Sequence, residues 1–428
     1  MTQDDVSSSQ ARAAEKAPRR TVLYPQHIEL TDKSHIIPFA GYLMPLWYSS
    51  IAREHMAVRE VAGIFDCTHM GVLEISGSRA AEFIDQLTTN AVMNLEVMQA
   101  RYSFLLDASG AVLDDLIVFR KGPDNFMLVV NAANSDKIRN WISALLSGEV
   151  CVDPRNSSRS IGSRLNMWDL RVVESGQDYS VDIALQGPKS IEVLLALVQG
   201  EETKSRIGEL RPFRFVQAEV GDVECLVSRT GYTGASIGFE LFVNPEKASS
   251  LWEIILQVGE PLGLLPCGLG ARDSLRIEAG FPLYGRELAG KFGISPYEAG
   301  YGWAVKLQKE FFIGKAAMEG VSGRYQMTVA RIQLPGTKGT RPVRPDDGVL
   351  DNKGRCLGWV TSAAFIGEKQ IALVYGEAKS LAEDASVGIY YAARSQGQIE
   401  KGRKQSIEKG EFLEPDLTGS VTGRFAKF

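Results

Sequence analysis

A run of three predicted strands near residue 100 most restricts what this chain can fold into. The segment RYSFLLDASGAVLDDLIVFRKGPDNFMLVVNAAN, residues 101–134, alternates apolar runs with the turn sequences DASG and KGPDN. Short turns of this kind join antiparallel neighbours, whereas parallel strands need a crossover of a dozen or more residues. The segment predicts an antiparallel meander. With helical patterns on both sides, including serine-capped starts at Ser78 and Ser135, it favours an α+β fold over a doubly wound parallel sheet.

Two adjacent carboxylates, Asp114 and Asp115, interrupt the middle strand of this meander. Asp is disfavoured inside strands, and burying an uncompensated charge is costly. Because side chains alternate, Asp115 shares a face with Ile117 and Phe119, and Asp114 lies on the opposite face. Whichever face of the strand meets the core, one of the two carboxylates therefore lies on it. This carboxylate could cap a neighbouring turn at a sheet edge. Alternatively, it serves as an acid or orienting group in a partly apolar pocket, with its pKa raised by desolvation.

A second predicted strand also carries a carboxylate among apolar residues. In GFELFV, Glu240 follows a glycine-rich hairpin. Two such carboxylates in separate strands suit a flat, nitrogen-rich ring such as a pterin or a purine, held by a bidentate carboxylate between aromatic walls. Candidate walls are Tyr102, Tyr232 and Trp303, although each of them could instead be a core residue.

Basic and nucleophilic residues leave more than one interpretation open. CGLGARDSLRIEAG places Arg272 and Arg276 one helical turn apart, where they could pair with Asp273 or Glu278 or form an anion site. Neither a GxGxxG fingerprint nor a P-loop is present, which argues against a dinucleotide site. His69 in DCTHMG has no Ser or Cys nucleophile in a known motif, and we interpret it as a structural, hydrogen-bonding histidine.

Composition excludes several classes of function. The net charge of −5 gives no general attraction to nucleic acid or to an anionic membrane, and no apolar run of about 18 residues could span a bilayer. The 5 cysteines are dispersed without CxxC, and the 4 histidines lack metal-binding spacing, so we expect neither disulfides nor a metal site. The first 20 residues are polar with no signal sequence, and they predict a disordered tail on a cytoplasmic protein.

The length of 428 residues predicts two or three domains. Residues 1–22 form the expected tail, and residues 23–325 form a core of two interleaved α+β lobes. Beyond residue 325 short β-rich runs such as QMTVARIQL and KQIALVYG alternate with polar turns, which indicates a small β-barrel or sandwich over residues 326–428. The charged stretch EKGRKQSIEKGEFLEPDLTG predicts an exposed excursion of this domain.

Several strings together resemble one family. LYPQHIEL, FAGYLMPLWY, HMAVREVAGIFDCTHMG, GAVLDDLIV, LVVNAAN, QGP, SRTGYTG, GFELFV, CGLGARDSLRIEAG and PLYGRE follow the order found in the aminomethyltransferases, the T-proteins of the glycine cleavage system. The resemblance is dense from about residue 23 to about residue 320. It implies a three-domain cloverleaf of antiparallel sheets around a central tetrahydrofolate site, with the small C-terminal β-barrel as the third domain.

The resemblance also implies roles for individual residues. The catalytic aspartate of the family corresponds to Asp115, with Ile117 and Phe119 as pocket wall. The pterin ring would be held by Glu240 and Arg272. Four further positions match pocket-lining residues with less specific motifs: Tyr102, Tyr232, Asn131 and Trp303.

In such enzymes an aminomethyl group on the lipoyl arm of H-protein yields its methylene to tetrahydrofolate, and ammonia leaves. The catalytic carboxylate would orient the nucleophile and stabilise an iminium-like cation. The chain departs from the family at Ala235, at Ala363 in TSAAFIGEKQ and in the terminal TGRFAKF. Because these departures fall where a donor would approach, two alternatives stay open: a tetrahydrofolate-dependent demethylase with another methyl donor, and a non-catalytic folate-binding protein.

Overall fold

The predicted meander forms the centre of an antiparallel five-stranded sheet in the computed structural model of the chain, which describes residues 17–162, 164–172 and 180–428. The strand order is β6-β7-β8-β5-β9. The strands are β5 (Gly71–Ser76), β6 (Gln99–Leu106), β7 (Val112–Gly122), β8 (Asn125–Val130) and β9 (Asn166–Asp169). Strand β7 pairs antiparallel with both β6 and β8, which confirms the meander.

Helices cover only one face of this sheet. They are α3 (Ala80–Leu87) and α4 (Ser135–Ser147). Leu116 of β7 packs against them, whereas Phe119 on the opposite face packs against a second sheet. Asp114 therefore lies on the helix-covered face, and Asp115 lies on the face that meets the second sheet.

The expected serine caps on these helices are wrong. The N-cap residue of α3 is Arg79, that of α4 is Asn134, and neither makes a side-chain hydrogen bond to its own helix. The Asn134 amide instead donates to the buried Asp114. A buried carboxylate competes for the same polar group, and its hydrogen bond is charge-assisted, so the tertiary partner takes the place of the local cap.

The second lobe is a six-stranded sheet with the order β11-β12-β13-β10-β4-β14. Its strands are β4 (Gly63–Asp66), β10 (Val181–Gln186), β11 (Phe215–Val220), β12 (Val223–Ser228), β13 (Gly238–Val243) and β14 (Leu265–Cys267). Only the pairing of β14 with β4 is parallel within this sheet. Its helices are α1 (Tyr24–Leu30), α2 (Ile51–Glu60), α5 (Ser190–Leu197), α6 (Glu201–Gly208), α7 (Pro245–Gly259) and α8 (Leu269–Ala279). Of these, α5, α6 and α7 enclose an apolar core that contains the fully buried Trp252.

A small three-stranded sheet precedes this lobe. Its strands are β1 (Arg19–Arg20), β2 (Ile36–Phe39) and β3 (Tyr42–Pro45), in the order β1-β3-β2. Of the tail expected over residues 1–22, residues 1–16 lie outside the described part of the chain. Arg19 and Arg20 pair with Tyr42 and Leu43 of β3.

The C-terminal lobe is a closed barrel with the order β15-β18-β17-β16-β19-β20, which agrees with the predicted fold class. Its strands are β15 (Met327–Pro335), β16 (Gly348–Leu350), β17 (Cys356–Ile366), β18 (Lys369–Glu377), β19 (Ser386–Tyr390) and β20 (Leu417–Thr422). Helix α9 (Lys315–Val321) precedes the barrel, and α10 (Gln396–Glu400) lies at the start of the charged excursion. Closing the sheet leaves no free strand edge.

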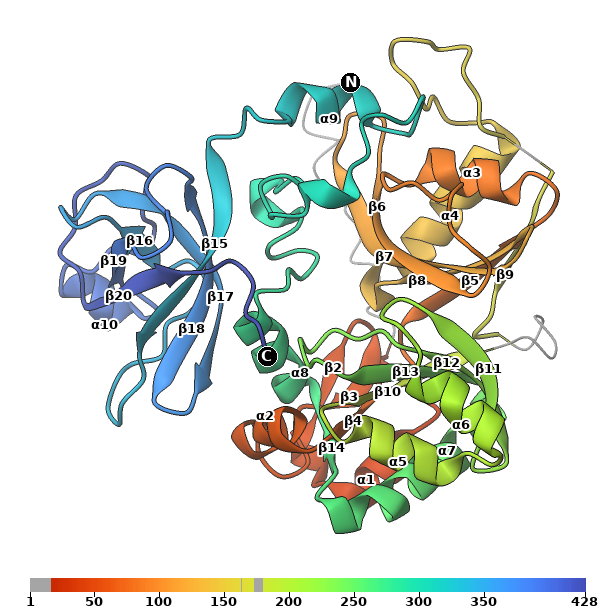
Figure 1. Cartoon of the computed structure of the whole chain (residues 1–428). Coiled ribbons are helices and arrows are strands. Elements are labelled where there is room, and N and C mark those ends of the chain that lie inside the picture. The colour runs from red at the N-terminus through yellow and green to blue at the C-terminus, as the bar shows by residue number, and fades with distance from the viewer. Residues whose placement is uncertain (1–16, 163, 173–179) are drawn as a thin grey trace.

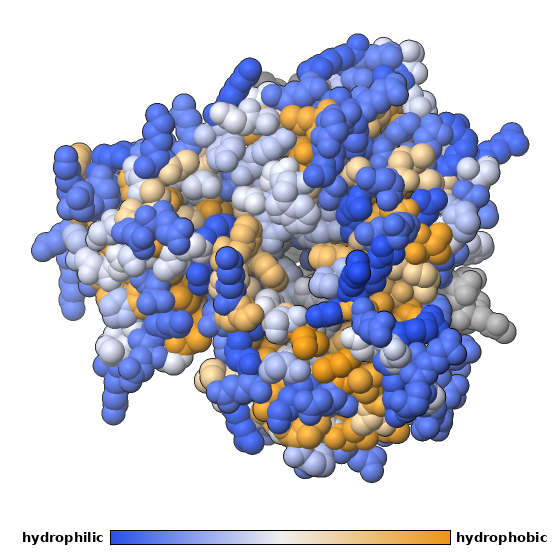
Figure 2. Space-filling model, viewed as in Figure 1, coloured by the Kyte–Doolittle hydropathy of each residue, from blue (hydrophilic) through white to orange (hydrophobic). Residues whose placement is uncertain are grey.

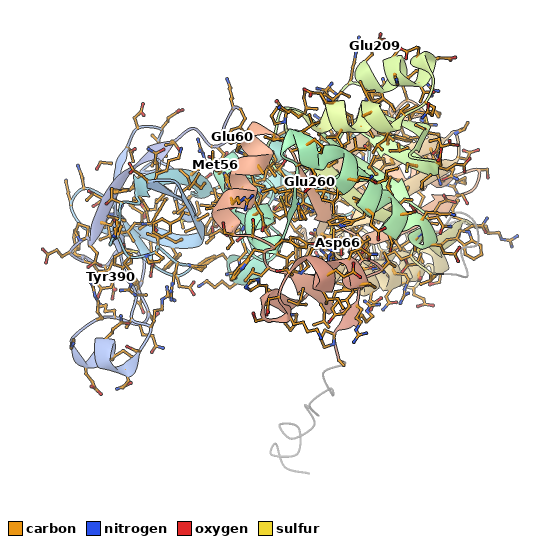
Figure 3. All side chains as sticks on the ribbon, turned by 90° about the horizontal axis from the view of Figure 1, so that it is seen from below. Met56, Glu60, Asp66, Glu209, Glu260 and Tyr390 are labelled. Atoms are coloured by element: carbon orange, nitrogen blue, oxygen red, sulfur yellow. The ribbon has the colours of Figure 1, made fainter. Side chains whose placement is uncertain are left out.

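The three lobes surround the centre of the molecule, with the barrel beside the other two (Figure 1). In the space-filling view the surface is indented where the lobes meet (Figure 2). Seen from below, the barrel lobe, marked by Tyr390, stands beside the second lobe, marked by Glu209 and Glu260 (Figure 3).

Arg276 fastens the barrel to the second lobe. Its guanidinium donates to Glu287 at 2.7 Å, to Asp273 at 2.8 Å and to the Ser362 hydroxyl of β17 at 2.8 Å. Of the two arginines expected on one face of this helix, Arg276 therefore forms ion pairs with Asp273 and Glu287, outside the barrel, and reaches the barrel through its hydrogen bond to Ser362.

Candidate active site

The two α+β lobes and the segment that follows α8 enclose a cavity of about 510 Å³. Its described lining residues lie between Phe39 and Trp303, so the barrel contributes none of them. The cavity brings together the residues to which the resemblance assigned the catalytic and folate-binding roles: Asp115, Glu240, Arg272, Tyr102, Tyr232, Asn131 and Trp303. These residues come from segments far apart along the chain, and their individual roles stay predictions.

Asp115 faces the cavity and is held by two hydrogen bonds. The Tyr102 hydroxyl donates to Oδ2 at 2.9 Å, and the Asn131 amide donates to Oδ1 at 2.9 Å. Burial raises the pKa of Asp115, and the two hydrogen bonds offset part of that rise. Two fixed donors orient the carboxylate, so its position is set before any ligand arrives.

Asp114, on the other side of the strand, is fully buried and accepts three hydrogen bonds. The Asn131 backbone donates at 3.0 Å, the Asn131 amide at 2.8 Å and the Asn134 amide at 2.6 Å. Burial and the neighbouring charge of Asp115 raise the pKa of Asp114 to about 7. Asn131 contacts both carboxylates, so Asp114 holds the residue that in turn orients Asp115.

Phe119 is not pocket wall, contrary to what the resemblance implied. Its ring packs between Phe215 and Phe242, at centroid distances of 5.4 and 5.3 Å, in the apolar contact between the two sheets. Ile117, two residues earlier on the same face, does line the cavity. The cavity therefore begins where the sheet-to-sheet packing ends.

An aromatic cluster forms one wall. The ring of Tyr102 lies 5.3 Å from that of Tyr301 and 6.0 Å from that of Trp303, measured between centroids. Trp303 is 52% exposed, so it lies where the cavity reaches solvent. Aromatic faces at such spacings suit a flat ring system.

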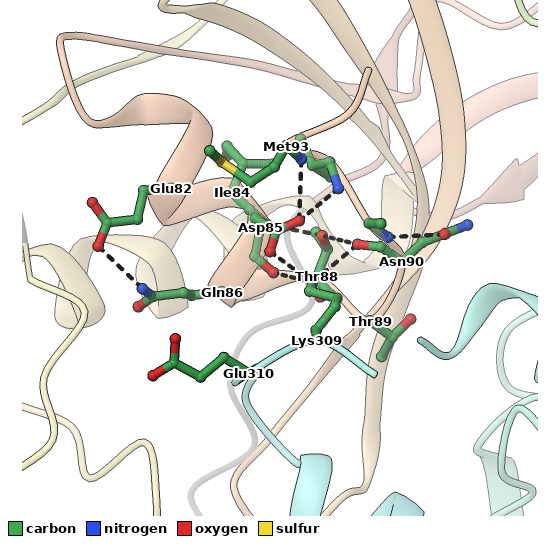
Figure 4. A network of polar contacts seen from close by, with 12 residues as sticks. Glu82, Ile84, Asp85, Gln86, Thr88, Thr89, Asn90, Met93, Lys309 and Glu310 are labelled. Atoms are coloured by element: carbon green, nitrogen blue, oxygen red, sulfur yellow. Dashed lines mark hydrogen bonds and ion pairs between the residues drawn. The ribbon is translucent and has the colours of Figure 1, made fainter. Parts of the chain in front are cut away.

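A buried lysine, Lys309, lies among backbone carbonyl groups at the end of α3 (Figure 4). The Lys309 ammonium donates to the carbonyl oxygens of Asp85, of Thr88 at 2.7 Å and of Asn90 at 3.0 Å. The Asn90 amide then donates to the Tyr102 carbonyl at 2.9 Å. Burial lowers the pKa of Lys309 to about 8, while Asp85 opposes this change. These hydrogen bonds connect the chain segment after α8, which carries Lys309, to the strand that carries Tyr102.

Polar residues of the second lobe form another part of the lining, which we call the Arg272 cluster. It consists of Asp182, Glu240, Arg272, Cys67 and His69, of which all but Cys67 line the cavity. The Thr230 hydroxyl donates to Glu240, and Arg272 donates to the Cys67 sulfur at 3.0 Å.

Burial governs the charges of this cluster. It raises the pKa of Glu240, against the hydrogen bond from Thr230 and the charge of Arg272. Burial would lower the pKa of Arg272, but the surrounding acidic groups outweigh it and the pKa is raised, so the guanidinium stays charged. The cluster thus offers a fixed cation and hydrogen-bond acceptors in an enclosed, mostly apolar site.

Sequence reasoning missed the two further cluster members that line the cavity, Asp182 and His69. Asp182 lies within the apolar run VDIALQ, the same signal that drew attention to Asp115 and Glu240. His69 was interpreted as a hydrogen-bonding structural residue, but its Nδ1 has no hydrogen-bond partner among the described residues. Burial lowers the pKa of His69 to about 4, so the ring is neutral near pH 7. The sequence around His69, DCTHMG, contains no partner residue that would have identified it as part of a site.

The described residues contain no group of three or more His, Cys, Asp or Glu that could hold a metal ion. In the same part of the chain, the helices are too short or too polar to cross a bilayer.

Comparison with known proteins gives consistent matches. Residues 24–309 match the family model of the GCVT N-terminal domain. An aminomethyltransferase of Desulfitobacterium hafniense (strain Y51) is 38% identical over 348 residues, which cover 81% of this chain and 86% of that protein. An aminomethyltransferase of Geobacillus thermodenitrificans is 42% identical over 303 residues, covering 70% of this chain and 74% of the other.

A solved structure is similar over nearly its whole length. The crystal structure of glycine cleavage system aminomethyltransferase T from Bartonella henselae superposes with a TM-score of 0.73 at 27% sequence identity. The match covers 95% of this chain and 97% of that chain. It therefore includes the C-terminal barrel, where the sequence resemblance is thin.

Proposed function

This chain belongs to the aminomethyltransferase family, and on that premise we propose that it transfers a methylene group from an aminomethyl carrier to tetrahydrofolate, with release of ammonia. The observation that carries the proposal is the cavity in which Asp115, held by Tyr102 and Asn131, faces the same space as Glu240 and Arg272. An orienting carboxylate and a ring-binding cluster are the two parts that this reaction needs in one enclosure.

The cavity suits the substrate in shape and in chemistry. Its apolar and aromatic lining fits the faces of a pterin ring, and the Glu240 carboxylate fits the N–H groups along the edge of that ring. Tetrahydrofolate supplies the nitrogen that takes up the methylene group. The chain holds the ring between Tyr102 and Tyr232 and orients it with Glu240.

Asp115 acts electrostatically in this proposal. As ammonia leaves, positive charge develops at the methylene carbon, and an ionised carboxylate nearby stabilises it. The partly apolar surroundings strengthen that attraction relative to water. Asn131 and Tyr102 keep the two oxygens in place, so little reorganisation is needed during the step.

We propose the lipoylated H-protein of glycine cleavage as the donor partner. A long, thin prosthetic arm can reach a carboxylate inside a cavity that a folded protein surface cannot enter. Since the relatives compared are bacterial metabolic enzymes, we also assign the reaction to the cytoplasm.

The test is ammonia release from aminomethylated H-protein in the presence of tetrahydrofolate. Wild type should turn over, Asp115→Asn should not, and Asp124→Asn, at the exposed turn of the same meander, should match wild type. Tight tetrahydrofolate binding without turnover on H-protein would exclude this donor and leave a demethylase acting on another methyl donor. Failure to bind tetrahydrofolate would overturn the proposed substrate itself.

A further inference from the structure

One carboxylate in the cavity has a feature that the proposed reaction does not use. Asp182 lies inside β10, is 2% exposed and lines the cavity, and its Oδ1 has no hydrogen-bond partner among the described residues. Buried polar atoms in folded proteins are nearly always paired, and an unpaired one calls for an explanation. A group missing from the protein alone, such as a bound ligand, is the natural partner.

Strand register places Asp182 beside Glu240. In the antiparallel pair β10 and β13, Ala184 lies opposite Glu240, and Asp182 lies opposite Phe242. All four side chains therefore share one face, and the two carboxylates are diagonal neighbours, within reach of a common ligand. Phe242 on that face packs into the contact between the two sheets, so the carboxylates look into the space beyond it.

The neighbouring cation does not satisfy Asp182. The guanidinium of Arg272 donates to the Cys67 sulfur, and its effect on Asp182 is through charge alone. Burial and the charge of Glu240 raise the pKa of Asp182 well above its usual value. Keeping such a group in an apolar strand destabilises the protein, and the cost is offset if the group binds a ligand.

We propose that Asp182 is a second ring-binding carboxyl of the tetrahydrofolate site, which accepts a hydrogen bond from the amino substituent of the pterin; this rests on the proposed function. The edge of that ring carries one ring N–H and an exocyclic amino group, three N–H donors in all. One carboxylate can pair side by side with only two of them. Glu240 takes that pair, and Asp182 takes the remaining amino hydrogen.

This arrangement makes Asp182 a specificity-determining residue. A ring without the amino substituent would leave Asp182 unpaired in the complex, and that lost bond lowers affinity. Glu240 alone would discriminate less, because its bond to the ring N–H survives in such an analogue. The pair thus distinguishes an amino-substituted pterin from rings of the same shape.

The experiment measures equilibrium binding rather than turnover. Tetrahydrofolate and an analogue lacking the amino substituent are titrated calorimetrically against wild type, Asp182→Leu and Asp182→Asn. Leu has the same branched shape without acceptors, and Asn keeps the volume and one acceptor oxygen. Glu224→Gln, at an exposed position of β12 in the same sheet, is the matched control.

We expect Asp182→Leu to weaken tetrahydrofolate binding by about tenfold or more, from the usual cost of leaving a buried donor, here the amino hydrogen of the ligand, unpaired. It should change binding of the analogue less than about twofold. Asp182→Asn should show a smaller loss for tetrahydrofolate alone, and this variant decides the matter if the Leu variant does not fold.

Equal losses for both ligands would overturn the inference, because they would show a packing role for Asp182. Unchanged tetrahydrofolate binding in both variants would overturn it as well. These outcomes are distinct from failure of the proposed function, in which the wild-type protein itself does not bind tetrahydrofolate.

Discussion

Replacing Asp115 by Asn should abolish most of the activity while leaving the fold intact. Asn has the same shape, and its oxygen can still accept from Asn131, while its amide can donate to the Tyr102 hydroxyl. What is lost is the negative charge. A carboxylate about 4 Å from a developing unit charge, at an effective dielectric constant of about 20, contributes about 4 kcal/mol. That corresponds to a fall in kcat of about a thousandfold.

The matched change at the neighbouring position, Asp114→Asn, should lower the stability of the protein much more than its activity. Asp114→Asn keeps one acceptor oxygen and puts an amide donor among three existing N–H donors, from Asn131 and Asn134. Each buried donor left unpaired costs about 1–3 kcal/mol, so we expect the free energy of unfolding to fall by about 2–4 kcal/mol. Activity of the folded fraction should fall far less than in the Asp115 variant.

Single-turnover release of ammonia gives the rate of the chemical step, and denaturant unfolding followed by circular dichroism gives stability. An Asp115→Asn rate above about a tenth of the wild-type rate would contradict this role, because the charge would then contribute under about 1.4 kcal/mol. Equal losses of activity and stability in the two variants would contradict it as well, since the opposite faces of β7 would then have the same role.

Three further predictions concern other parts of the molecule. Glu240→Ala should weaken tetrahydrofolate binding by roughly 10- to 100-fold in calorimetric titration, because a hydrogen bond to a charged group is removed; unchanged affinity would exclude Glu240 from ring binding. Burial raises the pKa of Asp66, but the bond from His27 and other contacts lower it to about 2, so its ionised form stabilises the fold above the unfolded pKa. That contribution, of about 2.5 kcal/mol, should be lost as the pH falls from about 5 toward 2, and Asp66→Asn should show a shallower pH dependence of unfolding in that window. Phe425→Ala removes a ring whose centroid lies 5.4 Å from that of Tyr301 in the aromatic wall. This change should raise the Kd for tetrahydrofolate severalfold without changing the far-ultraviolet circular dichroism spectrum. An unchanged Kd would show that Phe425 is not needed to position the wall.

Local patterns predicted the elements well because they depend on neighbours along the chain. The turns DASG and KGPDN set the meander, and the alternation of side chains separated Asp114 from Asp115. Helix starts were predicted less well, because the N-cap residue Asn134 gives its amide to a tertiary partner. A local preference of about 1 kcal/mol yields to a charge-assisted bond in the core.

Sequence by itself also determined which residue types could form a site, since carboxylates inside apolar strands are costly wherever they occur. Only the tertiary structure decided which of them meet. Packing of one sheet against another left Asp115 facing the cavity and covered Phe119 farther along the same face, and the register of β10 on β13 brought Asp182 beside Glu240. Side-chain alternation is a property of a few adjacent residues, whereas register and packing join strands that are distant in the chain, so no local pattern encodes them.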